Sequence, residues 1–425
     1  MDRKTEKRRI MLLPPTVFPI PATCGGAVEQ LITHLLDINE KENRAKFIVV
    51  SKYEEQAAKI QYRNSDVYYL DSDGFVMGWA KGFRVLWALY RAWLRIFHNH
   101  VAERFLGKLQ YRMDLYSFQC ALIAKIMHVD VVVNELHDFG CDAPLAVFND
   151  VVGREGFYNH IHSVREENLD SRRIINNSIS ISEYVRDRWV KDQSIKGKNE
   201  VLYNCVDVEK FQNTLSEAER IEARKKLGIS EKEFLVLFCG RLASEKGVEQ
   251  LLDAFDLLHS RAEKNIRLLL IGSAAFSMGN ITDFSRKIVE RALDNPSVVV
   301  LGFIPNEQLP LYYGLSDAQV VPSIWQEGAG VVAIEGMAAG LPLIITQSGG
   351  MPEYVGKGAA IQLPIDSKLP EHIADAIVKL AQNPNLCKKM GDAGKKRAKD
   401  FSREAYYSSF LDIVGNRSDN ERIEL

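Results

Sequence analysis

Two glutamates, Glu327 and Glu335, stand eight positions apart among glycines and other small residues. An apolar run typical of a strand precedes them, and the segment "GAGVV" between them predicts the start of a helix. The bare N–H groups and positive dipole end of such a helix suit an anion. Each carboxylate accepts two hydrogen bonds, which suits the adjacent hydroxyls of a sugar. Phosphate between two sugars is the layout of a nucleotide sugar, so we expect that class of ligand.

A plain helix with exposed glutamates is the alternative, although glycine disfavours helix formation. Two cations earlier in the chain favour the anion site, because Arg241 follows a predicted strand and Lys246 precedes a predicted helix. Ligands bind beyond the carboxyl ends of parallel strands, where two cations beside a helix N-terminus suit a diphosphate. Solvated loop charges are the competing interpretation. Gly272 ends the next predicted strand, and a structural turn is the favoured explanation there.

Short β-branched runs alternate with helical patterns along the whole chain, which predicts βαβ units and parallel sheets. We predict strands at residues 8–14, 45–51, 66–70, 130–135, 156–162 and 178–182 of the first half. We predict further strands at residues 233–240, 266–272, 297–303, 318–323 and 342–346 of the second half, with helices between them. Two complete strand–helix series predict an α/β protein with two Rossmann-like domains that face each other across a cleft.

At 425 residues, two domains are also the expectation from length alone. We place an N-terminal acceptor-side domain at 1–205 and a C-terminal nucleotide-sugar-binding domain at 206–399. The amphipathic helix at about 400–416 is a candidate to pack back on the first domain. The strongly charged stretch at 216–228 predicts a solvated helix.

The net charge of −2 and the pI of about 6.5 give no general attraction to nucleic acid. Six scattered cysteines without a CxxC pair predict free thiols in a reducing compartment. The basic N-terminus is interrupted by prolines, which argues against a signal peptide, and no apolar run is long enough to cross a bilayer. We therefore expect a cytoplasmic protein.

Residues 78–112 combine aromatic side chains at helical spacing with nearly unopposed positive charge. This composition suits an interfacial helix on anionic lipid, which would make the protein peripheral on the inner face of the membrane. The equal alternative is a helix whose aromatic stripe packs on the N-terminal sheet. The stretch from Asp71 to Asp73 superficially resembles a metal motif, but its position in a predicted loop indicates a turn.

The segment "PSIWQEGAGVVAIEGMAAGLPLI" resembles the Glu-x7-Glu signature of the family 4 retaining glycosyltransferases (glycosyl transferases group 1), which have the GT-B fold. Further segments resemble the family in order along nearly the whole chain: "GGAVEQLITHLLDI", "ISISEYVRDRW", "VLYNCVDVEKF", "GRLASEKGVEQLLDAF", "LGFIPNEQLPLYYGLSDAQVVPS" and "SGGMPEYV". The chain is similar to bacterial cell-surface polysaccharide members and to spore coat protein SA-like members. It departs from the family pattern at Cys205, where glycine is usual, and at Ala329, where an aromatic residue is common. Because Ala329 borders the sugar pocket, the second departure concerns the identity of the donor sugar.

The resemblance implies a role for each matching residue. Arg241 and Lys246 would bind the leaving diphosphate, and His162, at a strand end, would face the donor sugar. Glu327 would bind hydroxyls of that sugar, and Glu335 would bind the nucleotide ribose. The remaining donor-binding candidates are Gly25, Gly26, Gly272, Gly328, Ala329, Gly330, Val331 and His137. For both histidines, a plain surface or core residue is the alternative.

The resemblance thus implies transfer of a hexosyl or related sugar from a nucleoside diphosphate sugar to a hydroxyl of a saccharide or lipid-linked acceptor. Cell-surface polysaccharide or glycolipid synthesis would be the setting, with no metal and no cofactor besides the donor. Two alternatives share the architecture. A nucleotide-sugar epimerase would need no acceptor, and a non-catalytic coat protein would have kept the fold without the activity.

Overall fold

The computed structural model describes residues 7–15, 17–70, 115–135, 151–153, 155–163, 177–190, 197–212, 215–273 and 282–415. The expectations for Asp71 to Asp73, for 78–112 and for His137 lie outside these residues. The chain divides into two compact units. The first unit contains the residues up to Ile181, Val185–Leu202 and the stretch from Tyr407, and the second contains Ser182–Tyr184 and Tyr203–Tyr406.

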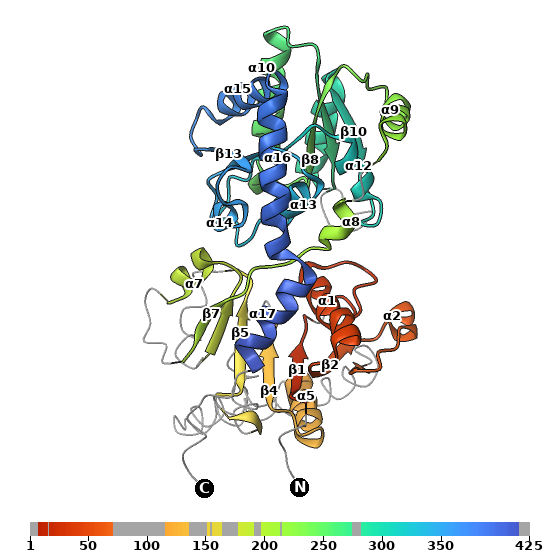
Figure 1. Ribbon diagram of the computed structural model, residues 1–425, viewed down its shortest axis with the longest axis vertical. Coiled ribbons are helices and arrows are strands. Elements are labelled where there is room, and N and C mark those ends of the chain that lie inside the picture. Colours follow the sequence, from red (N-terminus) through yellow and green to blue (C-terminus); the bar gives the residue numbers. More distant parts are fainter. Residues whose placement is uncertain are drawn as a thin grey trace, which may run out of the picture. The chain divides into compact units, whose positions relative to one another are not determined.

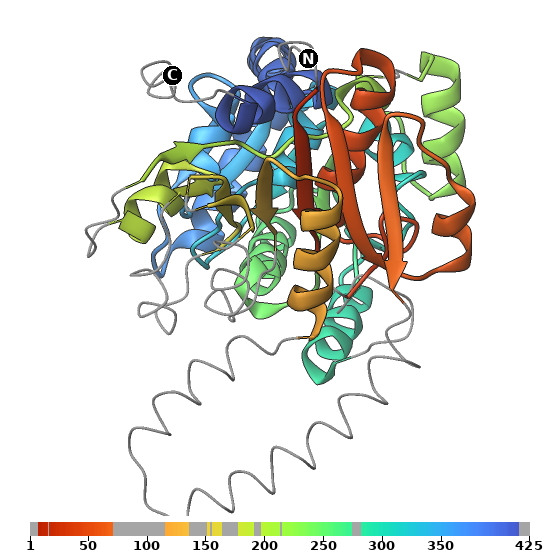
Figure 2. The same cartoon turned by 90° about the horizontal axis from the view of Figure 1, so that it is seen from below.

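The first unit is built on a parallel sheet with the strand order β3-β2-β1-β4-β5-β6-β7 (Figure 1). The strands are β1 (Arg9–Leu13), β2 (Lys46–Lys52), β3 (Ser65–Leu70), β4 (Val131–Asn134), β5 (Phe157–Ile161), β6 (Asn177–Ser180) and β7 (Asn199–Val201). Figure 2 shows β1, β2 and β3 side by side, in red to orange. All six strands predicted here are confirmed, whereas β7 was missed because this short edge strand has no buried apolar run.

The helices described in the first unit are α1 (Ala27–Glu42), α2 (Glu55–Lys59), α5 (Leu115–Ile126), α7 (Glu183–Val190) and α17 (Arg403–Gly415), the last two beginning in residues of the second unit. Helix α1 is amphipathic. Its apolar residues recur at the helical spacing and are buried: Val28, Leu31, Ile32, Leu35 and Leu36. Helix α17 contacts β2 through Phe410, whose ring centroid lies 6.1 Å from that of Phe47. It also contacts α1, since the Tyr407 hydroxyl donates to Asn39 Oδ1 at 2.7 Å.

The second unit is built on a parallel sheet with the order β10-β9-β8-β11-β12-β13. The strands are β8 (Phe234–Cys239), β9 (Ile266–Ile271), β10 (Val298–Gly302), β11 (Ala318–Val321), β12 (Leu343–Thr346) and β13 (Ala360–Leu363). Its helices are α8 (Val208–Gln212), α9 (Glu217–Lys226), η4 (Ser244–Lys246), α10 (Val248–Ser260), α11 (Asp283–Asp294), α12 (Leu309–Leu315), α13 (Val331–Ala339), α14 (Met351–Val355), α15 (Leu369–Ala381), α16 (Pro384–Ala398) and η5 (Lys399–Phe401). The five strands predicted in this half are confirmed.

Both faces of the second sheet are buried. Along β8, Val236 and Phe238 belong to a core formed with α10, α11 and α15, whereas Leu235 and Leu237 belong to a core formed with α12, α13 and α14. Strands that are buried on two faces read as continuous apolar runs. The apolar runs made the strands recognisable in the sequence. They carry no information on which strands are neighbours, so the strand order could not be predicted.

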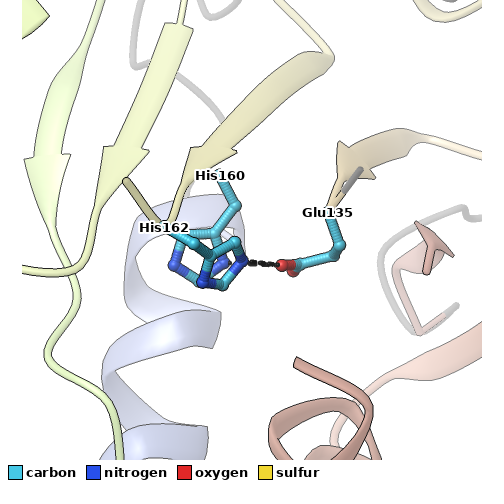
Figure 3. A group of neighbouring side chains, drawn as sticks. All are labelled: Glu135, His160 and His162. Carbon is cyan, nitrogen blue, oxygen red and sulfur yellow. Dashed lines mark hydrogen bonds and ion pairs between the residues drawn. The ribbon is translucent and has the colours of Figure 1, made fainter. Parts of the chain in front are cut away.

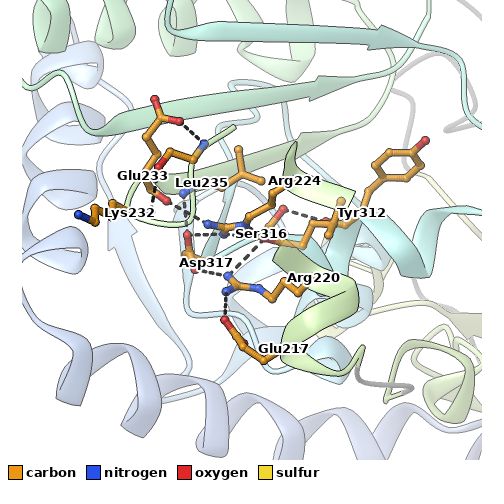
Figure 4. Close-up of polar contacts among 11 residues, drawn as sticks. Glu217, Arg220, Arg224, Lys232, Glu233, Leu235, Tyr312, Ser316 and Asp317 are labelled. Carbon is orange, nitrogen blue, oxygen red and sulfur yellow. Dashed lines mark hydrogen bonds and ion pairs between the residues drawn. The ribbon is translucent and has the colours of Figure 1, made fainter. Parts of the chain in front are cut away.

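Helix α9 corrects one expectation, because the charged stretch 216–228 is not solvated on all sides. Arg224 is only 1% exposed. Its guanidinium donates to Asp317 Oδ2 at 2.7 Å and to the Leu315 carbonyl oxygen at 2.6 Å (Figure 4). Arg220 also donates to Asp317, at 2.5 Å. The carboxylate of Asp317 offsets the desolvation cost of the buried Arg224 guanidinium, since buried charges require a partner.

No helix among the described residues combines the length and the apolar composition that crossing a membrane requires. The described cysteines are all free thiols, as expected: Cys24, Cys120, Cys205, Cys239 and Cys387.

Candidate active site

The carboxyl ends of three neighbouring strands of the second unit carry the predicted site residues. Arg241 follows β8, Gly272 follows β9, and Glu327 lies in the segment after β11. These strands are neighbours in the order β9-β8-β11, and they are parallel. Their carboxyl ends therefore share one edge of the sheet, the edge at which open α/β sheets bind ligands.

Lys246 and Glu327 are in direct contact, although 81 positions separate them. Lys246 Nζ donates to Glu327 Oε1 at 2.5 Å. Ser323 Oγ donates to the same oxygen at 2.6 Å. The two segments are further joined by Ile324 N, which donates to the Glu245 carbonyl oxygen at 3.0 Å. The predicted phosphate-binding cation and the predicted sugar-binding carboxylate thus form one charge-assisted pair.

Arg241 lies at the same strand edge but pairs with a different carboxylate. Its Nη2 atom is 3.0 Å from Glu245 Oε1, and 38% of its side chain is exposed. The structure therefore brings Lys246 and Glu327 together and places Arg241 beside Glu245 at the end of the neighbouring strand.

Two glycines hold the backbone of this edge in place. A Cβ atom on Gly272 would lie 1.8 Å from the Gly240 carbonyl oxygen, so the ends of β8 and β9 approach too closely for a side chain. A Cβ atom on Gly349 would lie 2.1 Å from the Glu327 carbonyl oxygen. Close packing against Gly240 thus accounts for glycine at position 272, and its predicted donor-binding role stays a prediction. Gly349 has φ of +52° and lets the turn after β12 support the Glu327 segment.

Helix α13 begins at Val331 with Gly330 as its N-cap, close to the predicted start. No side chain among the described residues caps it. The segment Gly328, Ala329 and Gly330 thus leads from Glu327 into a helix N-terminus whose first N–H groups lack a side-chain acceptor. Such a terminus favours anions through its N–H groups and its dipole.

Glu335 lies on α13, one helical turn beyond this start. The Tyr313 hydroxyl of α12 donates to Glu335 Oε2 at 2.6 Å. Burial raises the pKa of Glu335 to about 7, against the opposing effects of the Tyr313 hydrogen bond and of Lys210. Tyr313 and Ser323, which orient the two glutamates, were missed in the sequence. Nothing distinguishes them there, because Tyr313 sits in an apolar run and Ser323 is the last residue of the predicted strand 318–323.

In the first unit, Gly25 and Gly26 follow β1, and Gly26 caps α1 with φ of 98°. A Cβ atom on Gly26 would lie 2.1 Å from Oε2 of the buried Glu29, and the positive φ favours glycine at this position. Burial also raises the pKa of Glu29. The predicted ligand-facing role of both glycines stays a prediction beside this packing role.

His162 directly follows β5 and belongs to a buried group with Glu135 and His160 (Figure 3). Its Nε2 atom is 2.8 Å from Glu135 Oε2, and His160 Nδ1 is 2.9 Å from the same oxygen. Burial alone would raise the pKa of Glu135, but the two imidazoles hold it well below its usual range. Glu135 and His160 were missed in the sequence. The signal that was available is their polar character at the ends of two apolar strands.

The same three residues have the chemistry of metal ligands. Their donor atoms lie within 4.8 Å of one another, and they are the one such group among the described residues. Two imidazoles and a carboxylate are a donor set that binds zinc and related ions. The expectation that no metal is used stays a prediction.

Residues 219–397 match the family model described as glycosyl transferases group 1. This segment is similar to the catalytic domain that the group 1 family model describes. The matched region contains nine of the predicted site residues: Arg241, Lys246, Gly272, Glu327, Gly328, Ala329, Gly330, Val331 and Glu335. The resemblance to glycosyl transferases group 1 that the sequence motifs indicated is confirmed over this segment.

Curated relatives carry glycosyltransferase and coat-protein names. The chain is 34% identical over 158 residues to an uncharacterized glycosyltransferase of Methanocaldococcus jannaschii, covering 37% of this chain and 38% of the relative. It is 29% identical over 264 residues to spore coat protein SA of Bacillus subtilis, covering 60% and 68%. It is 30% identical over 233 residues to a D-inositol 3-phosphate glycosyltransferase of Segniliparus rotundus, covering 53% and 51%. The matches to the first and third relatives thus span about half of their length or less.

The fold extends over nearly the whole chain. The crystal structure of Anabaena HepE in complex with UDP-glucose superposes with a TM-score of 0.68 at 17% identity, covering 96% of this chain and 99% of that one. The two-sheet α/β architecture predicted as GT-B is confirmed by this likeness.

Proposed function

We propose that this chain is a retaining glycosyltransferase of family 4, which moves a sugar from a nucleoside diphosphate sugar to a hydroxyl of a saccharide or lipid-linked acceptor. Cell-surface polysaccharide or glycolipid synthesis is the proposed setting. The observation that carries the proposal is the contact between Lys246 and Glu327 beside the uncapped start of α13. The group 1 domain and the glycosyltransferase names of the relatives support it.

The geometry of the second unit supports the assignment of different groups of the donor to different residues. Lys246 would exchange Glu327 for the diphosphate, and this exchange would free the Glu327 carboxylate for hydroxyls of the donor sugar. Arg241 and the N–H groups of α13 would add positive charge at the same strand edge. Glu335, held by Tyr313, would accept hydrogen bonds from the ribose.

The proposed reaction breaks the bond between the anomeric carbon and the diphosphate oxygen, and the acceptor oxygen bonds to the same face of that carbon. Because the new bond forms on the face that the diphosphate leaves, configuration is retained. The acceptor proton passes to the departing diphosphate, and no protein carboxylate is needed as a nucleophile. Charge on the departing diphosphate would be stabilised by fixed cations and N–H groups, which usually supply the largest catalytic contribution. The resemblance adds His162 of the first unit, as a neutral imidazole towards the donor sugar. No metal is required in this scheme.

The first test is a thermal-shift screen of the full chain with UDP-, GDP-, ADP- and TDP-sugars, followed by transfer assays with and without added acceptors. The proposal expects one nucleotide class to raise the melting temperature and product to form only when an acceptor is added. Conversion of the donor sugar without an acceptor would instead identify an epimerase.

The similarity to spore coat protein SA favours one second candidate, a non-catalytic coat component. The retained pair of Lys246 and Glu327 argues for activity. Failure of every nucleotide and nucleotide sugar to bind would replace the transferase proposal with this second candidate.

A further inference from the structure

A buried carboxylate in the first unit is in contact with two imidazole rings from the neighbouring strand and its end. Glu135 directly follows β4, and the register pairs the preceding Asn134 with Asn159 of β5. His160 lies in β5 and His162 just beyond it, so the two alternate positions direct both rings to one side of the sheet. The ring centroids are 4.2 Å apart. The side chains of Glu135 and His160 are 2% and 0% exposed, and that of His162 is 6% exposed.

Both rings approach the same carboxylate oxygen, Glu135 Oε2. His162 Nε2 makes a hydrogen bond of 2.8 Å to it. His160 Nδ1 lies 2.9 Å from it in a close contact without hydrogen-bond direction. An ionised carboxylate only accepts hydrogen bonds, and a bare ring nitrogen at this distance would be repelled by it. Each of these two nitrogens must therefore carry a hydrogen atom.

We propose that Glu135 is a positioning residue, which holds His162 in the Nε2-protonated tautomer while His160, protonated on Nδ1, keeps the carboxylate in place. A neutral His162 then has its lone pair on Nδ1. The contribution of this arrangement to sugar transfer rests on the role of His162 in the proposed function. The tautomer assignment depends only on the contacts.

The second histidine explains how the carboxylate stays fixed. Glu135 Oε1 and both ring nitrogens of His160 are buried and have no hydrogen-bond partner among the described residues, so His160 holds the carboxylate by its close contact alone. The carboxylate is thus held through Oε2 alone, by His162 and His160. Removing His160 would take away the second close contact on Oε2, and the orientation of the Glu135 carboxylate and of the His162 ring would loosen with it. In histidine–carboxylate pairs, the carboxylate sets the tautomer and the ring orientation, and the imidazole does the chemistry.

The direct test is nuclear magnetic resonance of the full chain labelled with ¹⁵N-histidine, since long-range ¹⁵N–¹H correlations distinguish the two tautomers. The chain has nine histidines, and the variants His160→Gln and His162→Gln assign their two signals by loss. In the neutral form of the two rings we expect opposite tautomers, with Nε2–H for His162 and Nδ1–H for His160. This measurement needs no altered Glu135, so it stands even if such variants fold poorly.

Kinetics test the consequence for transfer. In Glu135→Gln we expect a mixed His162 tautomer and a kcat lowered about 10- to 100-fold, with the donor KM changed less than about 3-fold. Glu135→Asp, which keeps an acceptor-only carboxylate, should retain the tautomer and recover part of kcat. The control is His372→Gln, because His372 forms an exposed carboxylate pair with Asp366 in the second unit and should leave both readouts unchanged.

An Nδ1–H tautomer or a mixture at His162 in the unaltered protein would overturn the assignment. An unchanged tautomer and kcat in Glu135→Gln would overturn the positioning role. So would one equivalent of bound metal that His160→Gln removes, because the three residues would then be ligands. If the unaltered chain binds no nucleotide and transfers no sugar, the proposed function fails. The tautomer assignment is then still decided by the nuclear magnetic resonance measurement alone.

Discussion

A single oxygen atom, Glu327 Oε1, accepts from both Lys246 and Ser323. Two charged groups in contact are costly to separate unless each finds a new partner. A diphosphate sugar supplies both partners at once, phosphate for the ammonium and hydroxyls for the carboxylate. Neither inorganic phosphate nor a free sugar would supply both, so we expect each alone to bind weakly compared with the joined donor.

Replacement of Lys246 by alanine should lower transfer about 10²- to 10³-fold, because one group that stabilises the departing charge is lost. The measurement is kcat/KM with the donor identified in the screen. The matched control is Lys264→Ala, an exposed lysine of the same unit, which should leave the rate unchanged. Equal losses in the two variants would contradict the role of Lys246.

Glu335 predicts a dependence on pH. Its pKa is raised by burial from 4.5 to about 7, so the folded protein holds a proton on Glu335 that the unfolded chain releases between these values. The contribution to stability is therefore present at low pH and is lost as pH rises through about 7. Nucleotide affinity should change in the opposite direction, since the ionised carboxylate is the better acceptor for ribose hydroxyls.

Calorimetric titration of the bound nucleotide between pH 5.5 and 8.5, with urea unfolding over the same range, measures both effects. Glu335→Gln should flatten both curves. Tyr313→Phe should move the midpoint to higher pH, because the hydrogen bond from Tyr313 lowers the pKa of Glu335. A nucleotide affinity that is independent of pH in the unaltered chain would argue against contact between Glu335 and the ribose.

At the scale of elements, α9 is attached to the second sheet by ionic contacts as well as apolar ones. Asp317 precedes β11 and receives hydrogen bonds from Arg220, from Arg224 and from the backbone N–H of Leu235. One carboxylate therefore joins α9, β8 and β11. These contacts lie at the amino end of β11, so they serve stability and not the site beyond its carboxyl end.

Asp317→Ala should lower the free energy of unfolding by about 3–5 kcal/mol, because the buried Arg224 guanidinium would lose its carboxylate. Equilibrium unfolding in urea measures this loss. Asp283→Ala is the matched control: its side chain is 87% exposed, it pairs with Arg286 at 2.5 Å, and it should cost much less. Similar losses in both variants would show that the Arg224 pair contributes little.

Most of the elements could be predicted because they repeat one simple pattern. Buried parallel strands are continuous apolar runs, and α1 and α10 have apolar residues at helical spacing. The Glu327–Glu335 segment was recognisable because its parts are adjacent in the chain. The contact between Glu135 and His160 was not, since it depends on β4 and β5 being neighbours in the sheet. Burial of Arg224 depends likewise on Asp317, 93 positions away.

At the scale of the whole molecule, the first unit is assembled from both ends of the chain. Its sheet comes from the N-terminal half, and α17 covers it with residues from Tyr407 onward. Phe410 is fully buried, and its ring lies against Phe47 of β2. The sequence predicted a division between 1–205 and 206–399. The two compact units of the structure meet along the chain between Leu202 and Tyr203.

Phe410→Ala should lower the stability of the first unit by about 3–5 kcal/mol, because a buried aromatic ring is removed from its core. Hydrogen exchange read separately for each unit measures where the loss falls. We expect faster exchange in β1 and β2 and unchanged exchange in β8 and β9. Equal acceleration in both sheets would mean that the two units unfold as one.

The position of α17 also orders events on the ribosome. All residues of the second unit, the last of them Tyr406, are translated before the part of α17 that belongs to the first unit, which begins at Tyr407. At roughly 5–20 residues per second, the stretch from Tyr203 to Tyr406 takes about 10–40 seconds to translate, and β1 to β7 wait for that time without their covering helix. The nascent protein should therefore complete its second unit first and its first unit last.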